Sequence, residues 1–259
     1  MTVLARGFVG LVLVFLYLPI VVMASMSFNA SPLYAMPFVF STEWFTALAD
    51  DDVVLTAARN SVLIAVATSL LATALGTAAA VALHRARFPG RDALRVLILP
   101  PIAIPWLITG TAMLLFFFWT GIGRGLHAML IGHVALAIPY VVLVVNTGLA
   151  GVRIDLEEAA KSLGSTPLHA FFAVTFPLLL PSVIAAALFA FAVSLDQFVI
   201  SYFLATPGVV TLPVQIYAAI RKGFTPEINA VSTILLGASM VLILGFAWLT
   251  RGGGVLERR

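Results

Sequence analysis

The chain has little charge. Only 10% of its 259 residues are Asp, Glu, Lys or Arg, whereas 62% are hydrophobic. A soluble domain averages about 25% charged and about 45–50% apolar residues, so this sequence lacks the polar surface that would cover a globule in water. The composition therefore predicts a membrane protein. The net charge of +3 comes from arginines scattered between apolar blocks, which argues against nucleic acid as a partner.

Cysteine is absent and lysine is rare. The first absence excludes disulfides, thiolate zinc sites, iron–sulfur clusters and cysteine nucleophiles. Lys161 follows alanine and Lys222 follows arginine, so no phosphate-binding G-x-x-x-x-G-K-[S/T] loop exists. The histidines show no H-x-x-x-H spacing, and no serine stands in a G-x-S-x-G motif. We expect no metal site, no cofactor held by this chain and no enzymatic activity.

Long apolar runs are what the chain does have. A helix needs about 20 apolar residues to cross a hydrocarbon core of about 30 Å. Runs of about this length without alternation predict an all-α protein with six membrane spans. The expected spans are Phe8 to Met26, Ser61 to Leu83, Val96 to Trp119, Leu126 to Ala150, Pro181 to Leu204 and Asn229 to Thr250. The apolar part of the first span exceeds the usual 7–15 residues of a signal peptide, so we expect an uncleaved anchor.

The basic residues predict the orientation, because positive charge keeps loops in the cytoplasm. Most of them fall on the side of both termini and of the loops after spans two and four, namely Arg6, Arg85, Arg87, Arg91, Arg95, Arg153, Lys161, Arg251, Arg258 and Arg259. We therefore expect both termini to be cytoplasmic. We expect one membrane domain over residues 1–259, with a first span and outer segment (1–55) and a core (56–250) that includes a long cytoplasmic loop (151–180).

That loop has an organised pattern. Asp155 and Glu158 predict an N-cap with a capping box, which begins a short helix, and Glu157 with Lys161 would support its exposed face. Gly164 is expected to end this helix. Thr166 before Pro167 predicts a second N-cap and a second, amphipathic helix. The loop should therefore be two short helices joined at a bend.

The loop also carries a family signature. The permeases of ATP-binding-cassette (ABC) importers share the pattern E-A-A, three residues, G, nine residues, I, any residue, L-P. This chain resembles that pattern with every spacing kept, with Val and Phe in place of Ile and Leu, at Glu158, Ala159, Ala160, Gly164, Val174, Phe176 and Pro177. The resemblance extends over essentially the whole chain. It is closest to the subgroup that moves polyamines, opines and related amino compounds.

The resemblance implies a type I importer permease in the bacterial inner membrane. In that family the loop forms coupling helices that dock on an ATPase subunit, so Glu158, Ala159, Ala160, Gly164 and Pro177 are the expected coupling residues. The implied partners are a second permease, preferably in a heterodimer, a cytoplasmic ATPase dimer that binds ATP and Mg, an extracytoplasmic binding protein, and membrane lipid. The implied function is import of a small amino-containing solute by alternating access, with a polyamine such as spermidine or putrescine favoured.

Asp196 is the one acidic residue inside a predicted span, where a charge costs at least about 2.5–3.5 kcal/mol at the bilayer centre. With Ser194 and Gln197 nearby, it either binds an ammonium group in a central cavity or pairs within the assembly. Trp44 either stacks on a passing cation or anchors the outer segment at the membrane interface. Trp106 follows Pro105, at a position where polyamine permeases often carry an acid, and is a further candidate for the substrate pathway. Pro100, Pro101 and Pro105 are expected to kink or interrupt the third span.

Other functions stay open at the sequence level. Within the importer class, the solute could instead be an opine, an aminophosphonate or another amino-acid derivative. In a different class, an ion-gradient-driven secondary transporter or channel would carry several intramembrane acids or broken-helix repeats and would need no docking loop. A structural membrane scaffold is a third possibility, against which the organised loop argues.

Overall fold

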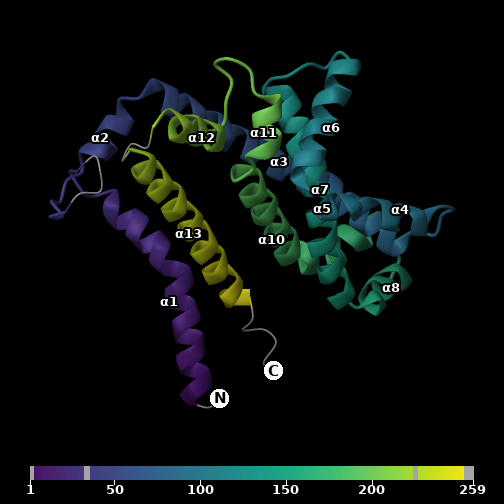
Figure 1. Cartoon of the computed structure of the whole chain (residues 1–259). Helices are drawn as coiled ribbons and strands as arrows, with labels where there is room; N and C mark the ends of the chain where they lie inside the picture. The colour runs from purple at the N-terminus through teal and green to yellow at the C-terminus, as the bar shows by residue number, and fades with distance from the viewer. Residues whose placement is uncertain (1–2, 32–35, 224–226, 254–259) are drawn as a thin grey trace. The chain divides into compact units, whose positions relative to one another are not determined.

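A computed structural model describes residues 3–31, 36–223 and 227–253, apart from the side chains of Val3 and of residues 242–253. The described residues are mostly helical (Figure 1), and the extended pairings among them are two isolated bridges, Asn29 with Phe40 and Thr206 with Val209. The all-α prediction is confirmed. The chain divides into two units, residues 1–56 with 215–245, and residues 57–214 with 246–259. The predicted boundaries within a single membrane domain stay a prediction.

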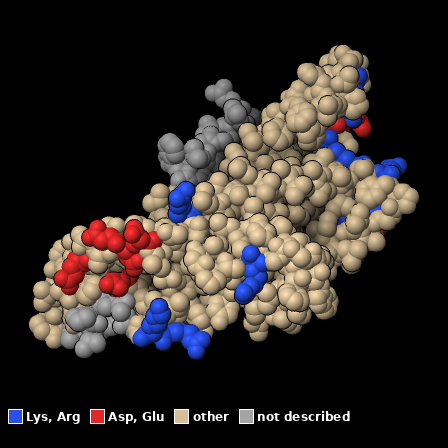
Figure 2. All heavy atoms as spheres, turned by 90° about the horizontal axis from the view of Figure 1, so that it is seen from above, with Lys and Arg blue, Asp and Glu red and all other residues tan. Residues whose placement is uncertain are grey.

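The first unit begins with α1 (Val3–Met26), whose apolar stretch is exposed along its whole length within the chain. A helix that is apolar all round suits lipid or another membrane helix. After it, Phe28 stacks on Phe40, and α2 (Glu43–Ala49) follows. This outer segment carries the acidic residues Glu43, Asp50, Asp51 and Asp52, and Figure 2 shows a patch of acidic side chains on the surface. Most of α13 (Glu227–Gly253) also belongs to this unit.

The second unit is built around α7 (Leu126–Gly151), of whose most apolar stretch 56% is buried, more than in the other candidate spans. α10 (Phe176–Leu195) packs along it, and α11 (Val199–Leu204) packs on α6 (Trp106–Trp119). One core cluster joins Val141 and Val145 to Leu179. A second surrounds Met129 with Ile200. α3 (Asp52–Arg85) supplies buried residues to both clusters. The small Ala72 and Ala80 belong to the first, and the larger Ile64 belongs to the second.

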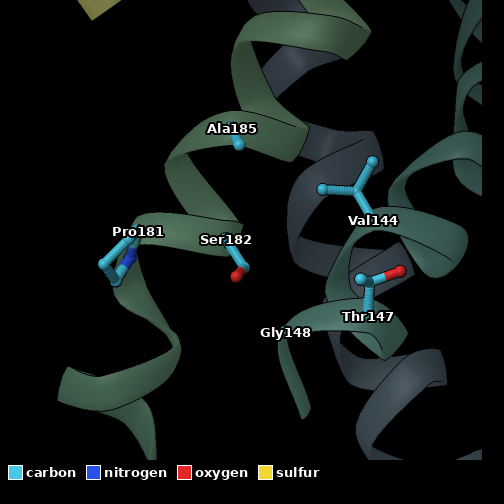
Figure 3. Close-up of a pocket in the computed structure, with 6 residues that line it drawn as sticks. All are labelled: Val144, Thr147, Gly148, Pro181, Ser182 and Ala185. Atoms are coloured by element: carbon cyan, nitrogen blue, oxygen red, sulfur yellow. The ribbon is translucent and has the colours of Figure 1, made fainter. Parts of the chain in front are cut away.

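α7 and α10 approach closely where α7 carries a glycine. A Cβ placed on Gly148 would lie 2.3 Å from the Ser182 hydroxyl oxygen, closer than atoms can pack. Figure 3 shows the two residues facing each other beside a hollow of about 450 Å³, lined by Val144, Thr147, Gly148, Pro181, Ser182 and Ala185. Small residues let membrane helices pack at short distance. Gly148 is thus required for this contact.

The predicted third span is broken. α4 (Arg91–Ile98) and α5 (Pro100–Ala103) form one arm, and the chain then bends by 109° into α6. Ile104 is extended (ψ 130°), as expected for the residue before a proline, and Pro105 precedes α6 as its N-cap. The interruption expected from the prolines is confirmed, but at 109° it is far sharper than a kink.

The six-span count stays a prediction. Among the described residues, four helices are long and apolar enough to cross a membrane, and the bent pair would make a fifth if it is one span. α13 is 27 residues long, but its side chains beyond Val241 lie outside the described residues. The predicted bounds of the fifth span are wrong. The helical stretch runs from Pro167 to Leu195 and does not continue to Leu204, because α11 begins as a separate helix at Val199.

Candidate functional site

The loop of residues 151–180 is a bent pair of helices. α8 (Ile154–Ser162) is followed by α9 (Pro167–Ala170) and by a π-helical turn, η1 (Phe171–Thr175), that leads into α10. Gly164 has φ +93°, a left-handed conformation that glycine adopts readily, so it permits the bend. The Thr166 side chain caps the second helix by accepting from the His169 N–H, with Pro167 in the first position. These parts of the loop prediction are confirmed.

The first helix differs from its prediction. Its N-cap is Arg153, not Asp155, so the expected capping box is wrong. Asp155 instead pairs with Arg153 at 2.9 Å on the surface. Glu157 does bond to Lys161 (2.9 Å between Oε1 and Nζ), but it is buried rather than exposed. The helix therefore begins earlier and turns a carboxylate inward.

Inside, Glu157 joins three elements. Its Oε2 accepts from Arg85 at the end of α3 and from the Thr175 hydroxyl of η1, at 2.6 Å from the latter. Arg85 also donates to the Thr175 oxygen at 3.0 Å and stacks on the Phe171 ring, 5.4 Å from its centroid. We call Arg85, Glu157 and Thr175 the joint. Sequence reasoning missed it, since Arg85 and Glu157 are 72 residues apart.

The joint favours the charged form of its carboxylate. Burial alone raises the pKa of Glu157, but hydrogen bonds from Thr175, Lys161 and Arg85, together with the positive charge of Arg85, lower the pKa by more. The net pKa lies below the ordinary glutamate value, so Glu157 is ionised at neutral pH. A pair of opposite charges with satisfied hydrogen bonds can then hold α8 to α3.

The bent pair exposes large apolar side chains on its surface. Leu163 is 89% exposed and Leu168 is 69% exposed. Of the signature residues, Glu158, Ala159, Gly164 and Pro177 are exposed and Ala160 is half-buried. Large apolar side chains at such exposure, beside small alanines, form a face suited to contact with another protein.

A groove of about 1100 Å³ opens between α3, α10 and the bent pair. Arg85 and Lys161 lie at the end of the groove near α8. Along α3 the groove is lined by Ser69, Thr73 and Thr77, spaced four residues apart on one helix face. The sequence reasoning did not single these hydroxyls out, although their spacing was a usable signal.

The break between α10 and α11 holds a buried polar cluster. His133 of α7 bonds through Nδ1 to the Ser194 hydroxyl (2.8 Å) and through Nε2 to the Ser201 hydroxyl (3.0 Å). The Gln197 side chain accepts from the backbone N–H groups of Val199 (3.1 Å) and Ile200 (3.5 Å), which caps α11. These bonds give partners to the first N–H groups of α11, which lack helical partners.

The predicted pathway residues do not all come together. Asp196 ends α10 and is exposed, whereas Ser194 and Gln197 are buried within the second unit. Trp44 belongs to the first unit, where its Nε1 donates to the Asn29 carbonyl (2.7 Å). Trp106 is the first residue of α6 and is 41% exposed. Their role in a substrate pathway stays a prediction.

Comparison with known proteins identifies the family. The family model "Binding-protein-dependent transport system inner membrane component" matches residues 72–252, more than half of the chain. The chain belongs to this family. Membership in a family of inner membrane components agrees with the long apolar helices of this chain. It also agrees with the resemblance found in the 151–180 loop.

Similar proteins include two curated transport proteins. The putrescine transport system permease protein PotI of Escherichia coli (strain K12) is 39% identical, over 90% of this chain and 85% of PotI. The spermidine/putrescine transport system permease protein PotC of the same organism is 33% identical, over 96% of this chain and 94% of PotC. A solved bacterial ABC transporter that imports the acidic polysaccharide alginate has the same fold, with a TM-score of 0.76 at 15% identity, covering 96% of this chain and 93% of that one. This likeness shows the fold alone.

Proposed function

We propose that this chain is the permease subunit of an ABC importer that carries a polyamine, such as putrescine or spermidine, into the cytoplasm. The observation that carries the proposal is the near full-length likeness to PotI and PotC, which are named for these substrates. The exposed apolar face of the bent pair supports an importer with a separate motor. The amino compounds considered from the sequence, an opine or an aminophosphonate, are the alternative cargoes.

The bent pair is the proposed coupling element. Glu158, Ala159, Ala160, Gly164 and Pro177 hold the signature spacing, and the exposed Leu163 and Leu168 flank the bend. Docking would bury these apolar side chains against an ATPase subunit, gaining about 25 cal/mol per Å² of apolar area removed from water. This chain would hydrolyse no ATP itself, and the ATPase dimer would bind ATP and Mg.

The remaining partners follow from the same proposal. A second permease, different from this chain, would complete the pathway, and an extracytoplasmic binding protein would deliver the polyamine. The groove lined by Ser69, Thr73 and Thr77 offers one wall for such a pathway. Both termini and the bent pair would face the cytoplasm, with α1 and the exposed apolar helices in contact with lipid.

Asp196 is the proposed cation contact. It is an exposed acid next to the helix break, so its carboxylate is free to meet a passing ammonium group. Trp44 and Trp106 are the aromatic candidates for contact with the cation. Asp196→Asn should reduce polyamine uptake at least ten-fold in a normally assembled complex, whereas Asp92→Asn, an exposed acid on α4, should leave uptake unchanged. Unchanged uptake with Asp196→Asn would limit this residue to a structural role.

The function itself is tested by reconstitution. The chain is purified with its companion permease, its ATPase and its binding protein, and placed in proteoliposomes with labelled putrescine. We expect uptake that needs both ATP and the binding protein. Uptake driven by an ion gradient without ATP would indicate a secondary transporter instead. ATP-dependent uptake of an opine but not of putrescine would show that the transported solute is an opine and not a polyamine.

A further inference from the structure

We infer that Arg85 and Glu157 are positioning residues that couple α8 mechanically to the end of α3 and, through it, to the broken span α4–α6. The inference rests on the proposed coupling role of α8 and adds the route by which its movement reaches the membrane helices. The described contacts give this route in two steps, both at the last turn of α3.

The first step is the joint. Among the ion pairs of the described residues, Arg85 with Glu157 connects two helices far apart in sequence, whereas the others lie within or at the start of α8. Thr175 is fully buried and bonds to both partners, so the joint also includes η1. Three mutually bonded side chains resist shear better than a single pair, because moving one breaks two contacts. α8 therefore cannot shift without pulling on Arg85.

The second step uses the same last turn of α3, through its backbone carbonyls. Arg91 of α4 donates through Nε to the Leu83 carbonyl (2.8 Å), and Arg95 donates to the same carbonyl (2.9 Å). Arg91 also reaches the His84 carbonyl at 3.3 Å. Carbonyls in the last turn of a helix lack helical partners, and cationic side chains there are favourable. α4 is thus fastened to the turn that carries Arg85.

The route ends at the break of the third span. α4 continues through α5 to Ile104, where the chain bends by 109° into α6. A stiff arm that ends at a sharp bend can convert a small displacement at α8 into a rotation about that bend. The η1 turn adds to this picture, since π-helical turns often occur at functional sites.

The test separates coupling from assembly. Glu157→Ala removes the joint, and Asp155→Ala removes an exposed acid from the same helix as the matched control. Arg85→Glu with Glu157→Arg and Lys161→Glu rebuilds the joint with reversed charges, because the lysine would otherwise face the new arginine. Each variant complex is assayed for ATP hydrolysis and for putrescine uptake. We expect Glu157→Ala to raise the ATP hydrolysed per putrescine imported at least ten-fold, the reversed pair to recover at least a third of the wild-type efficiency, and Asp155→Ala to stay within two-fold of wild type.

A second measurement needs no cargo. Because the chain has no cysteine, Ser162→Cys on α8 and Asp92→Cys on α4 can carry spin labels without removal of native thiols. We expect a single narrow distance distribution in the otherwise unchanged purified chain and a distribution at least twice as wide with Glu157→Ala. This readout decides the matter if the Glu157→Ala complex does not assemble or if putrescine is not the cargo.

Two results would overturn the inference. One is a proportional fall of hydrolysis and uptake with Glu157→Ala, which is what a merely structural role would give. The other is an unchanged distance distribution. A wild-type complex that imports no putrescine would instead count against the proposed cargo, and the distances would still report on the joint.

Discussion

The joint at Glu157 and the cluster at His133 both hold helices together through buried polar side chains, but they use different chemistry. The joint is ionic, because Arg85 pairs with Glu157, and the Arg85 side chain keeps 23% of its surface exposed. The same carboxylate also bonds to Lys161, which lies outside the joint. The cluster is built from a histidine and two hydroxyls within α7, α10 and α11. One lies in the loop that links two candidate spans and the other inside the helix bundle.

The difference follows from the cost of removing charge from water. An ion pair that keeps part of its surface in solvent avoids much of the desolvation penalty, whereas a fully buried pair must recover all of it. Burying neutral polar groups costs less than burying charges, and hydrogen bonds between membrane helices contribute about 0.6 kcal/mol each on average. The charged joint therefore holds α8 to α3 near solvent, whereas the neutral cluster holds α10 and α11 to α7 inside the second unit.

Arg85→Ala should show the largest effect. It leaves Glu157 buried with only Lys161 as a charge partner, so we expect a loss of about 3 kcal/mol in the free energy of unfolding, the low end for a broken buried pair. Denaturation of the purified chain in detergent measures this loss. Arg87→Ala, an exposed arginine two residues on, should cost less than about 0.5 kcal/mol. Equal losses in the free energy of unfolding for Arg85→Ala and Arg87→Ala would mean that the contacts of Arg85 in the joint stabilise the fold no more than an exposed arginine does.

His133→Ala should have a smaller effect, about 2 kcal/mol, because it leaves the Ser194 and Ser201 hydroxyls without their partner and opens a small cavity. A double-mutant cycle with Ser201→Ala should show coupling of at least about 0.5 kcal/mol. Strict additivity would mean that the histidine and the serine do not interact.

The joint should depend on pH. Since its folded-state pKa is lowered, Glu157 stabilises the fold above the pKa of the unfolded chain, about 4.3, and this contribution is lost as pH falls through the lower folded value. The Tm difference between wild type and Glu157→Gln should therefore be full at pH 7 and shrink toward zero below pH of about 4. A difference that persists in acid would mean that shape, and not charge, explains the role of Glu157.

Asp155→Asn should have the smallest effect. Its pair with Arg153 has side chains 66% and 75% exposed, and exposed pairs contribute about 0–1 kcal/mol. We expect a change within about 0.5 kcal/mol of zero by the same denaturation assay. A loss as large as that of Arg85→Ala would show that burial does not distinguish the Arg85–Glu157 pair from the Arg153–Asp155 pair.

Local signals in the sequence predicted local structure well. Gly164, Thr166 and Pro167 specified the bend and the start of the second helix, because each acts on its own backbone. The prolines near residue 100 predicted an interruption for the same reason. The capping box failed because Arg153 already begins α8, and Asp155 found a surface partner instead. The residue at which a helix begins depends on which of several neighbouring residues takes the N-cap position.

Contacts between distant residues were beyond the same reasoning. Glu157 was expected on an exposed face, and nothing local distinguishes its side from that of Glu158. The sequence did not single out His133, yet serines 61 and 68 residues away bond to both of its ring nitrogens. The groove beside Ser69 likewise needs three separate helices. Such sites exist only once the helices have packed.

The sequence by itself determined that this protein is helical, apolar and built for a membrane, and it marked the loop that identifies the family, because hydropathy, turns and caps are properties of short segments. The tertiary structure alone decided which charges meet, which serines enclose His133 and how sharply the third span bends. Those outcomes depend on which helices pack together and at what angle, and packing brings together residues that the chain keeps far apart.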